Sequence, residues 1–166
     1  MPEQATPTAL PLDSRAFRTT LGHFATGVTV VTMRYLEQDY GITVNAFMSV
    51  SLEPPLVVVS IDHKAKAYQS LCAVSHYGVS MLSHGQQPLS NYFAGFGAPE
   101  QAAPAMLEVQ GVPLLESALA HLVCRVVDRH EAGDHTLFIG QVEYLAYRDS
   151  APLLYYRGGY AALAES

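Results

Sequence analysis

The sequence has few charged residues, and this scarcity limits the classes of protein to which the chain can belong. Only 14% of the 166 residues are Asp, Glu, Lys or Arg, against about 25% in an average soluble protein. With 49% hydrophobic residues the chain is not disordered, and part of its surface is expected to lie in a subunit interface, so we predict a homodimer. A net charge of −6 without a Lys/Arg cluster makes nucleic acid an unexpected partner.

Signals for membrane insertion, secretion and metal binding are also missing. No run approaches the roughly 18 apolar residues of a membrane span, and the N-terminus does not resemble a secretory signal, so no membrane partner and a cytoplasmic location are expected. The seven histidines never form HxH, HxxxH or HExxH, and no metal site is predicted. Cys72 and Cys124 are the only cysteines, and we expect both to be inert core residues.

The pattern along the chain predicts one mainly β domain. Residues 1–12 are expected to form a flexible leader, and 13–166 a single domain. Asp13 caps a predicted helix with an apolar stripe of Phe17, Leu21 and Phe24, which ends at Gly27. About six strands are predicted, at 28–33, 41–47, 56–61, 78–83, 118–132 and 135–148, with short helices at 64–72 and 86–96. Mostly sequential strands with few helices favour an antiparallel β-barrel with short flanking helices.

Two local features are candidates for ligand chemistry, because phosphate-loop and dinucleotide-binding glycine motifs are absent. The segment Thr43–Pro55 places hydroxyls and an amide among apolar residues. It is either an irregular strand bonded to its own backbone or a polar wall facing a flat cofactor. Lys64 and Lys66 are the only lysines and both follow the predicted strand at 56–61. They are either solvated surface residues or the cationic part of an anion site at the start of a helix.

An ordered set of segments over about residues 13–163 resembles the flavin reductase-like family. These segments are Phe17–Thr32, Thr43–Phe47, Ser49–Leu52, Pro54–Leu56, Phe93–Ala94, Gly133–His135, Phe138–Gly140, Pro152–Tyr155 and Gly159–Tyr160. The resemblance implies an FMN-binding split barrel, usually a homodimer. It also implies reduction of FMN, with FAD as an alternative flavin, by NADH or NADPH, and transfer of the reduced flavin to a separate monooxygenase.

The resemblance also implies roles for particular residues. The flavin ring and ribityl chain would contact Asn45, Ala46, Phe47, Ser49, Val50 and Ser51. The phosphate would be held by Ser60, Ile61, Lys64, Lys66 and Gln69, and Phe93 and Ala94 would close over the flavin. The nicotinamide side would include Thr26, Gly27, His135 and Tyr160, with His135 as the candidate catalytic residue.

The segment 95–111 departs from the family pattern, since it has no basic residue, and the chain has no tryptophan. This departure leaves the reductant and the second substrate open. One alternative is an FMN-dependent enzyme that acts directly on an organic substrate. Another is a non-catalytic module that binds FMN. In the leading interpretation hydride passes from nicotinamide C4 to flavin N5, and the protein supplies stacking and alignment rather than a general base.

Overall fold

The computed structural model describes residues 7–97 and 101–163. Part of the predicted leader, residues 1–6, and the last three residues of the predicted domain lie outside the described residues, as do residues 98–100 of the atypical segment. The helices are α1 (Ser14–Leu21), α2 (Tyr68–Ala73), α3 (Gln87–Asn91) and the π-helix η1 (Tyr92–Phe96). The strands are β1 (Thr26–Gly27), β2 (Thr29–Tyr35), β3 (Gln38–Val44), β4 (Phe47–Leu52), β5 (Pro55–Asp62), β6 (His76–Met81), β7 (Met106–Val109), β8 (Val112–Leu115), β9 (Ala120–Ala132), β10 (His135–Tyr147), β11 (Leu154–Tyr156) and β12 (Gly159–Ala161).

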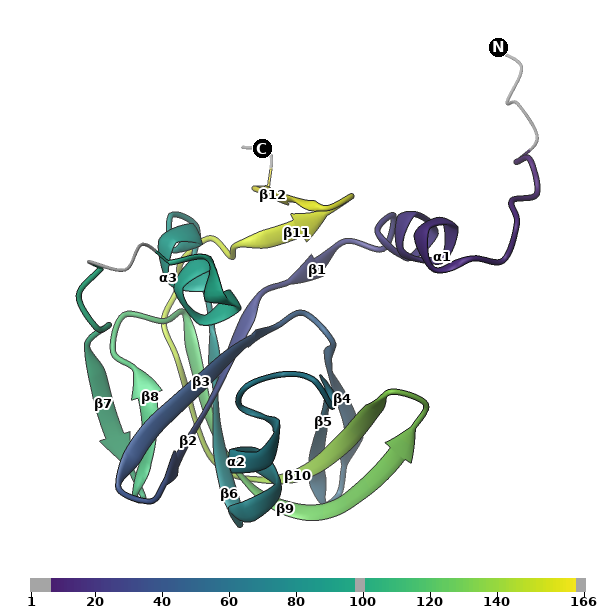
Figure 1. Ribbon diagram of the computed structural model, residues 1–166. Helices are drawn as coiled ribbons and strands as arrows, with labels where there is room; N and C mark the ends of the chain where they lie inside the picture. Colours follow the sequence, from purple (N-terminus) through teal and green to yellow (C-terminus); the bar gives the residue numbers. More distant parts are fainter. Residues whose placement is uncertain (1–6, 98–100, 164–166) are drawn as a thin grey trace.

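A seven-stranded antiparallel sheet forms the body of the molecule, in the order β3-β2-β6-β9-β10-β5-β4 (Figure 1). Its two edge strands, β3 and β4, are consecutive in the chain and are separated only by Asn45 and Ala46. A flat sheet would hold these edges six strands apart, so the sheet has to curl until they meet at this corner. The prediction of a mainly β antiparallel fold with short helices is confirmed.

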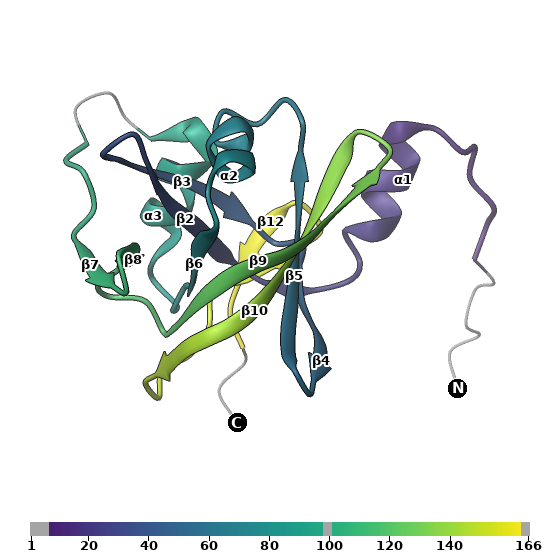
Figure 2. The same ribbon diagram turned by 90° about the horizontal axis from the view of Figure 1, so that it is seen from below.

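The β9–β10 hairpin is the longest element pair and bends across the molecule (Figure 2). Its turn contains Gly133 with a φ of +64°, a left-handed conformation that glycine adopts without steric cost. The register shifts once between Ile139 and Gly140 and again between Val142 and Tyr144. Such irregularities bend a strand and increase its twist, which lets one hairpin pair with both β5 and β6.

The core lies inside the curled sheet because side chains alternate along each strand. On β5 the inward residues Val57, Val59 and Ile61 are buried. Phe138 of β10 and Tyr77 of β6 are fully buried beside them. Burial of each such aliphatic or aromatic side chain contributes about 1.5–3 kcal/mol to folding.

Helix α1 is capped as predicted, since the Asp13 side chain accepts a hydrogen bond from the Ala16 amide at 2.8 Å. The helix stands away from the sheet and connects to it through β1 (Figure 1). None of its residues is buried. Phe17 and Leu21 on its apolar stripe, and Phe24 after it, are each at least half exposed. This apolar surface has no partner within the described part of the chain.

Several predicted boundaries are wrong for identifiable physical reasons. The first helix ends at Leu21 with Gly22 as its cap, not at Gly27, which belongs to β1. The predicted strand 41–47 is interrupted by the corner at Asn45, and its last residue begins β4. The predicted helix 64–72 begins only at Tyr68, because the preceding residues form turns. The hairpins β7–β8 and β11–β12 were not predicted, because strands of three or four residues give little periodicity.

The expectation that both cysteines lie in the core is half correct. Cys124 is fully buried, whereas Cys72 on α2 is exposed. Burial raises the pKa of the Cys124 thiol to about 12. Over residues 7–97 and 101–163, no helix is long and apolar enough to cross a membrane.

Candidate functional site

A cleft of about 820 Å³, here called the main cleft, opens between β3, the turn before α2 and the π-helix η1. Its volume lies within the range typical of small-molecule sites, and its surface is mostly apolar with a few polar groups. The lining consists of Asp39–Thr43, Ala65–Ala67, Tyr92–Gly95, Ala103, Pro104 and Met106. Three residues with a predicted flavin role therefore share this cleft, namely Lys66, Phe93 and Ala94.

The π-helix positions the aromatic wall of the main cleft. Such helices are rare and occur frequently at functional sites. Here Gly95 forms a kink within η1 with a φ of +83°, and the last residue of η1, Phe96, is 80% exposed. A methyl group on Gly41 of β3 would lie 2.5 Å from ring carbons of Phe93. The absence of a side chain at Gly41 thus allows the Phe93 ring to lie directly on the backbone of β3.

A second space of about 200 Å³, the middle cavity, adjoins the main cleft at Thr43 and Ala94, which line both. Its other lining residues are Val28, Asn45, Ser90, Phe96, Tyr155 and Tyr160. The Tyr160 hydroxyl donates to Asn91 Oδ1 at 3.0 Å, so Ser90 Oγ is left as the donor in its 2.8 Å contact with that hydroxyl. These bonds fix the ring of Tyr160 between β12 and α3. A predicted flavin residue, Asn45, and a predicted nicotinamide residue, Tyr160, therefore face the same cavity.

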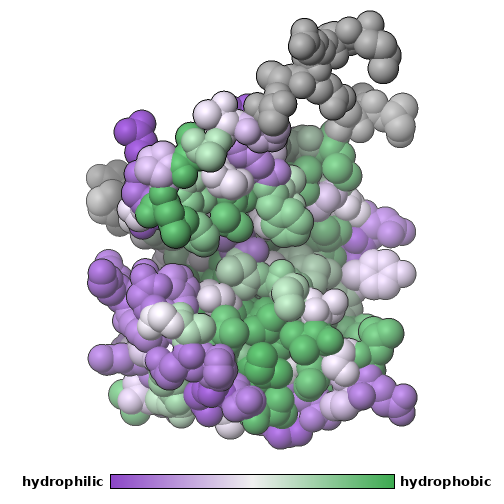
Figure 3. All heavy atoms as spheres, turned by 90° about the vertical axis from the view of Figure 1, so that its right-hand side faces the viewer, coloured by the Kyte–Doolittle hydropathy of each residue, from purple (hydrophilic) through white to green (hydrophobic). Residues whose placement is uncertain are grey.

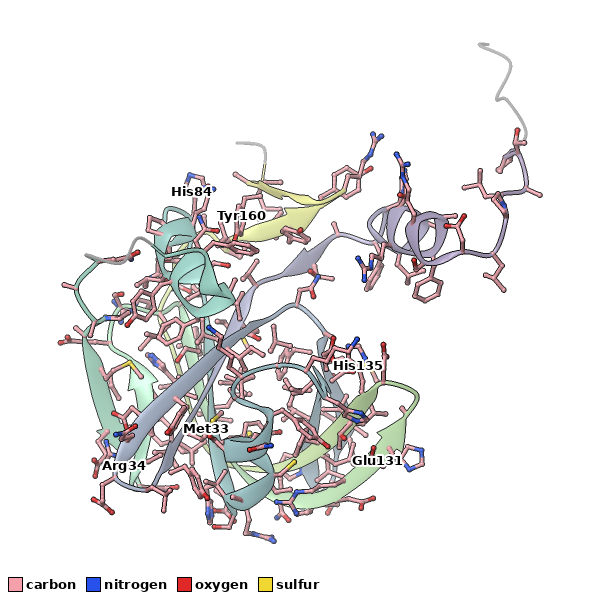
Figure 4. The ribbon with its side chains drawn as sticks, in the orientation of Figure 1. Met33, Arg34, His84, Glu131, His135 and Tyr160 are labelled. Atoms are coloured by element: carbon pink, nitrogen blue, oxygen red, sulfur yellow. The ribbon has the colours of Figure 1, made fainter. Side chains whose placement is uncertain are left out.

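A third space of about 560 Å³, the outer cavity, lies beyond Phe96 and Tyr160, which it shares with the middle cavity. Figure 4 shows His84 and Tyr160 at this end of the molecule, where α3 meets β12. The remaining lining residues are Gly85, Gln87, Pro88, Asn91, Gly97, Gln101, Leu153, Ala161 and Ala162. The three spaces are therefore adjacent in this order. The main cleft and the middle cavity share two lining residues, and so do the middle cavity and the outer cavity.

The turn between β5 and α2 carries both lysines and is tied to the sheet by a polar cluster. His63 Nε2 lies 3.1 Å from both Thr136 Oγ1 and Glu131 Oε2, and the Tyr68 hydroxyl lies 2.9 Å from Thr136 Oγ1. The rings of His63 and Tyr68 also pack together with centroids 5.0 Å apart. Lys64 and Lys66 themselves are exposed. Lys66 faces the main cleft, and Lys64 lines none of the three cavities.

The proton arrangement in this cluster follows from Thr136, which is 1% exposed and has one hydroxyl proton. That proton is donated to Glu131 Oε1 at 2.8 Å. The Thr136 oxygen must therefore accept from the Tyr68 hydroxyl and from a proton on His63 Nε2. A single hydroxyl, with all its hydrogen-bonding capacity used, thus connects the turn before α2 to β9 and β10.

His135 begins β10 next to Asp134, at the end of the long hairpin and away from Tyr160 (Figure 4). Its Nδ1 lies 2.7 Å from Asp134 Oδ1, and this hydrogen bond is the main cause that lowers the pKa of the Asp134 carboxyl. With Nδ1–H donating, Nε2 of the neutral ring is an acceptor. His135 lines none of the three cavities, so its contact with nicotinamide stays a prediction.

Most other predicted flavin residues lie on the strands next to the corner. Ala46 and Phe47 are held by backbone hydrogen bonds, from Ser60 N to Ala46 O and from Phe47 N to Asn45 O. Ser49, Val50 and Ser51 occupy edge strand β4, where the pairing skips Val50 and forms a bulge. None of these residues, nor Ser60, Ile61 and Gln69, lines any of the three cavities, and Ile61 lies in the core. Their predicted flavin contacts remain predictions.

Thr26 and Gly27, the remaining predicted nicotinamide residues, form β1 and pair with Tyr155 and Leu154 of β11. The Thr26 hydroxyl is buried and has no hydrogen-bond partner among the described residues. Tyr155 packs edge-on against Tyr160 with ring centroids 5.6 Å apart. Neither Thr26 nor Gly27 lines any of the three cavities, so their predicted nicotinamide contacts stay predictions.

Sequence reasoning missed several residues that line these spaces. Phe96, Asn91 and Tyr155 had no predicted role, although the glycines around Phe96 marked a break in the helical pattern. Thr136 gave no signal at all, because its partners lie up to 73 residues away in sequence. In the described parts of the chain, no group of three or more His, Cys, Asp or Glu residues could hold a metal ion.

Comparison with known proteins identifies the protein family that has this arrangement. The model of the flavin reductase like domain matches residues 21–164. The chain belongs to this family. It is 48% identical over 149 residues to an NADH-dependent flavin reductase of a Rhodococcus species, covering 88% of this chain and 84% of that protein. It is 39% identical to the reductase component of 4-hydroxyphenylacetate 3-monooxygenase of Thermus thermophilus, over 89% of this chain and 95% of that protein.

Solved structures agree with this membership. The flavin reductase PheA2 in its native state superposes with a TM-score of 0.90 at 44% identity, over 93% of this chain and 100% of that chain. The resemblance stated from the sequence is therefore confirmed, and the corner after β3 and the segment 92–94 belong to a fold shared by flavin reductases.

Proposed function

We propose that this protein is an NADH-dependent flavin reductase that supplies reduced flavin to a separate monooxygenase. The observation that carries the proposal is the pair of adjacent spaces that extends from Lys66 to Tyr160, within a fold shared with flavin reductases. Two residues expected to bind flavin, Asn45 and Ala94, and one expected to bind nicotinamide, Tyr160, line the same middle cavity, which supports the proposal. A hydride donor and its acceptor must lie face to face, since their alignment accounts for most of the acceleration.

The flavin substrate is assigned to the main cleft and the corner that follows β3. Lys66 supplies a cation for the phosphate of FMN, and Phe93 supplies an aromatic wall for a flat ring. FMN is the favoured flavin, with FAD as the alternative. When bound, the flavin accepts a hydride at N5 from nicotinamide C4. The chain's part is to hold the two rings in register and to exclude water.

The protein is proposed to act as a homodimer in the cytoplasm, where its nicotinamide donor is available. Figure 3 shows broad apolar areas on the side that carries α1 and β4. Exposed apolar side chains on this side include Phe17 and Leu21 of α1 and Met48, Val50 and Leu52 of β4. A stable dimer buries roughly 2,000 Å² or more, and such apolar residues suit its centre. Sedimentation at micromolar concentration should give a dimer, and a species of only 18.0 kDa would contradict it.

The reductase activity is tested by aerobic NADH oxidation with and without added FMN. We expect oxidation that depends on FMN and stops when either component is omitted. A protein that retains flavin but oxidises no NADH would instead support an enzyme acting on an organic substrate or a flavin-binding module. Bleaching of the bound flavin by an organic substrate would separate these two.

A further inference from the structure

His63 and Lys66 belong to one turn, between β5 and α2, but their side chains face different surroundings. Lys66 lines the main cleft together with Ala65 and Ala67. His63, earlier in the same turn, lines none of the three cavities. Its Nε2 atom lies 3.1 Å from Thr136 Oγ1 on β10. The turn therefore places a cation at the cleft and a hydrogen-bonding ring against the long hairpin.

Local hydrogen bonds shape this turn, but they do not join it to the hairpin. The Lys64 amide, for example, donates to Asp62 Oδ1 at 2.8 Å, within the turn itself. Among the described residues 63–66, the hydrogen bonds to the β9–β10 hairpin come from His63. Its amide donates to Asp134 O at 3.0 Å, and its ring supplies the remaining contacts. Without the ring, the backbone contact with Asp134 would be left to hold these residues on the hairpin.

The contact requires a proton on Nε2 of His63. Thr136 gives its one hydroxyl proton to Glu131, so its oxygen accepts from His63. Thr136 is 1% exposed, and water therefore does not easily replace a donor that is lost here. Glutamine carries its amide nitrogen as many bonds from Cβ as histidine carries Nε2, whereas the asparagine amide is one bond shorter and leucine has no donor. These residue types separate the hydrogen bond from the bulk of the side chain.

We propose that His63 is a positioning residue for flavin binding. Its Nε2–H group donates to Thr136 and thereby holds the turn so that the ammonium of Lys66 faces the phosphate of FMN. This inference rests on the proposed function, because it places FMN in the main cleft. His63 acts through Lys66 and does not itself touch the flavin, since its ring lines none of the cavities. Its effect is therefore confined to ligands that carry a phosphate, and it disappears when Lys66 is absent.

The test measures the affinity of the purified protein for FMN and for riboflavin, by titrations that follow flavin fluorescence. His63→Leu should bind FMN about threefold to tenfold more weakly, which is the range of one neutral hydrogen bond. Its affinity for riboflavin, which has no phosphate, should change by less than about twofold. His63→Gln should bind FMN as the wild type does. Equal losses for both compounds, or a glutamine variant as weak as the leucine variant, would overturn the proposal.

Two further variants serve as a backup and as a matched control. His63→Asn stays polar but is too short to reach Thr136, so it should lose FMN affinity even if the leucine variant folds poorly. His76 on β6 also lies close to a glutamate, with Nε2 3.2 Å from Glu143 Oε2, and its side chain is 36% exposed, against 33% for His63. It lines none of the cavities, so His76→Leu should change neither affinity. An equal loss of FMN affinity in this control would contradict the proposal.

A double-mutant cycle with Lys66→Ala tests the route of the effect. In a chain that already lacks this lysine, His63→Leu should weaken FMN binding by less than about twofold. Losses that add in full would show that His63 acts independently of Lys66 and would refute the proposal. The titrations need no nicotinamide donor. A wild-type protein that binds FMN but oxidises no NADH would contradict the proposed function, whereas the His63 variants would still decide the role of this ring.

Discussion

Replacing Thr136 with valine removes one buried hydroxyl while keeping the shape of the side chain. The hydroxyl donates to Glu131 and accepts from Tyr68 and His63, so the variant loses three contacts without opening a cavity. Each neutral hydrogen bond contributes about 0.5–1.5 kcal/mol, and partners that can turn to water recover part of that value. Because Glu131 is exposed and the two rings are half-buried, we expect a loss of about 1–2 kcal/mol.

Thermal unfolding followed by circular dichroism measures this loss. For a protein of this size, about 1–2 kcal/mol corresponds to a Tm about 2–8 °C lower. Thr136→Ser keeps the hydroxyl and should retain the hydrogen-bond contribution. A Thr136→Val protein as stable as wild type would refute the reasoning. A loss in the serine variant without a loss in the valine variant would show that Thr136 contributes through methyl packing instead.

Three further predictions concern the site and the cysteines. Lys66→Ala should weaken FMN binding by about 1–3 kcal/mol and should weaken the binding of riboflavin, which has no phosphate, much less. Equal losses of affinity for both compounds in flavin titrations would mean that the lysine acts through folding. His135→Ala should leave FMN affinity within about threefold but slow flavin reduction by more, and an unchanged rate with both NADH and NADPH would remove this ring from the mechanism. At pH 8, iodoacetamide should label the exposed Cys72 but not Cys124, whose thiol stays protonated until near its pKa of about 12; mass spectrometry showing two labels on the native protein would contradict this.

The sequence predicted best those elements whose signals are local. The β9–β10 hairpin was found because two long alternating segments flank a glycine that adopts the left-handed conformation. The end of α1 was placed too late, because Gly22 and Gly27 are both plausible stops and only the pairing of Gly27 with Leu154 decides between them. That pairing depends on the unpredicted strand β11.

In the candidate site, too, only the residues with a local sequence signal could be predicted. Lys64 and Lys66 both stood out because lysines are scarce, but only Lys66 lines the main cleft. The hydrogen bond between Thr136 and Tyr68 depends on the register in which β5 and β10 pair, and no local sequence pattern predicts that register. Phe96 could not be assigned to a cavity either, since its position depends on the packing of η1 beside Tyr160.

Direct hydride transfer between the two substrates is the central claim, and anaerobic stopped-flow spectroscopy tests it most directly. The FMN-loaded protein is mixed with NADH and with NADH deuterated at C4, and the visible absorbance of the flavin is followed. The account predicts a single-phase loss of flavin absorbance with one equivalent of NADH consumed, slowed by deuterium because the C4–H bond breaks in that step. Flavin that stays oxidised after NADH has bound would contradict it.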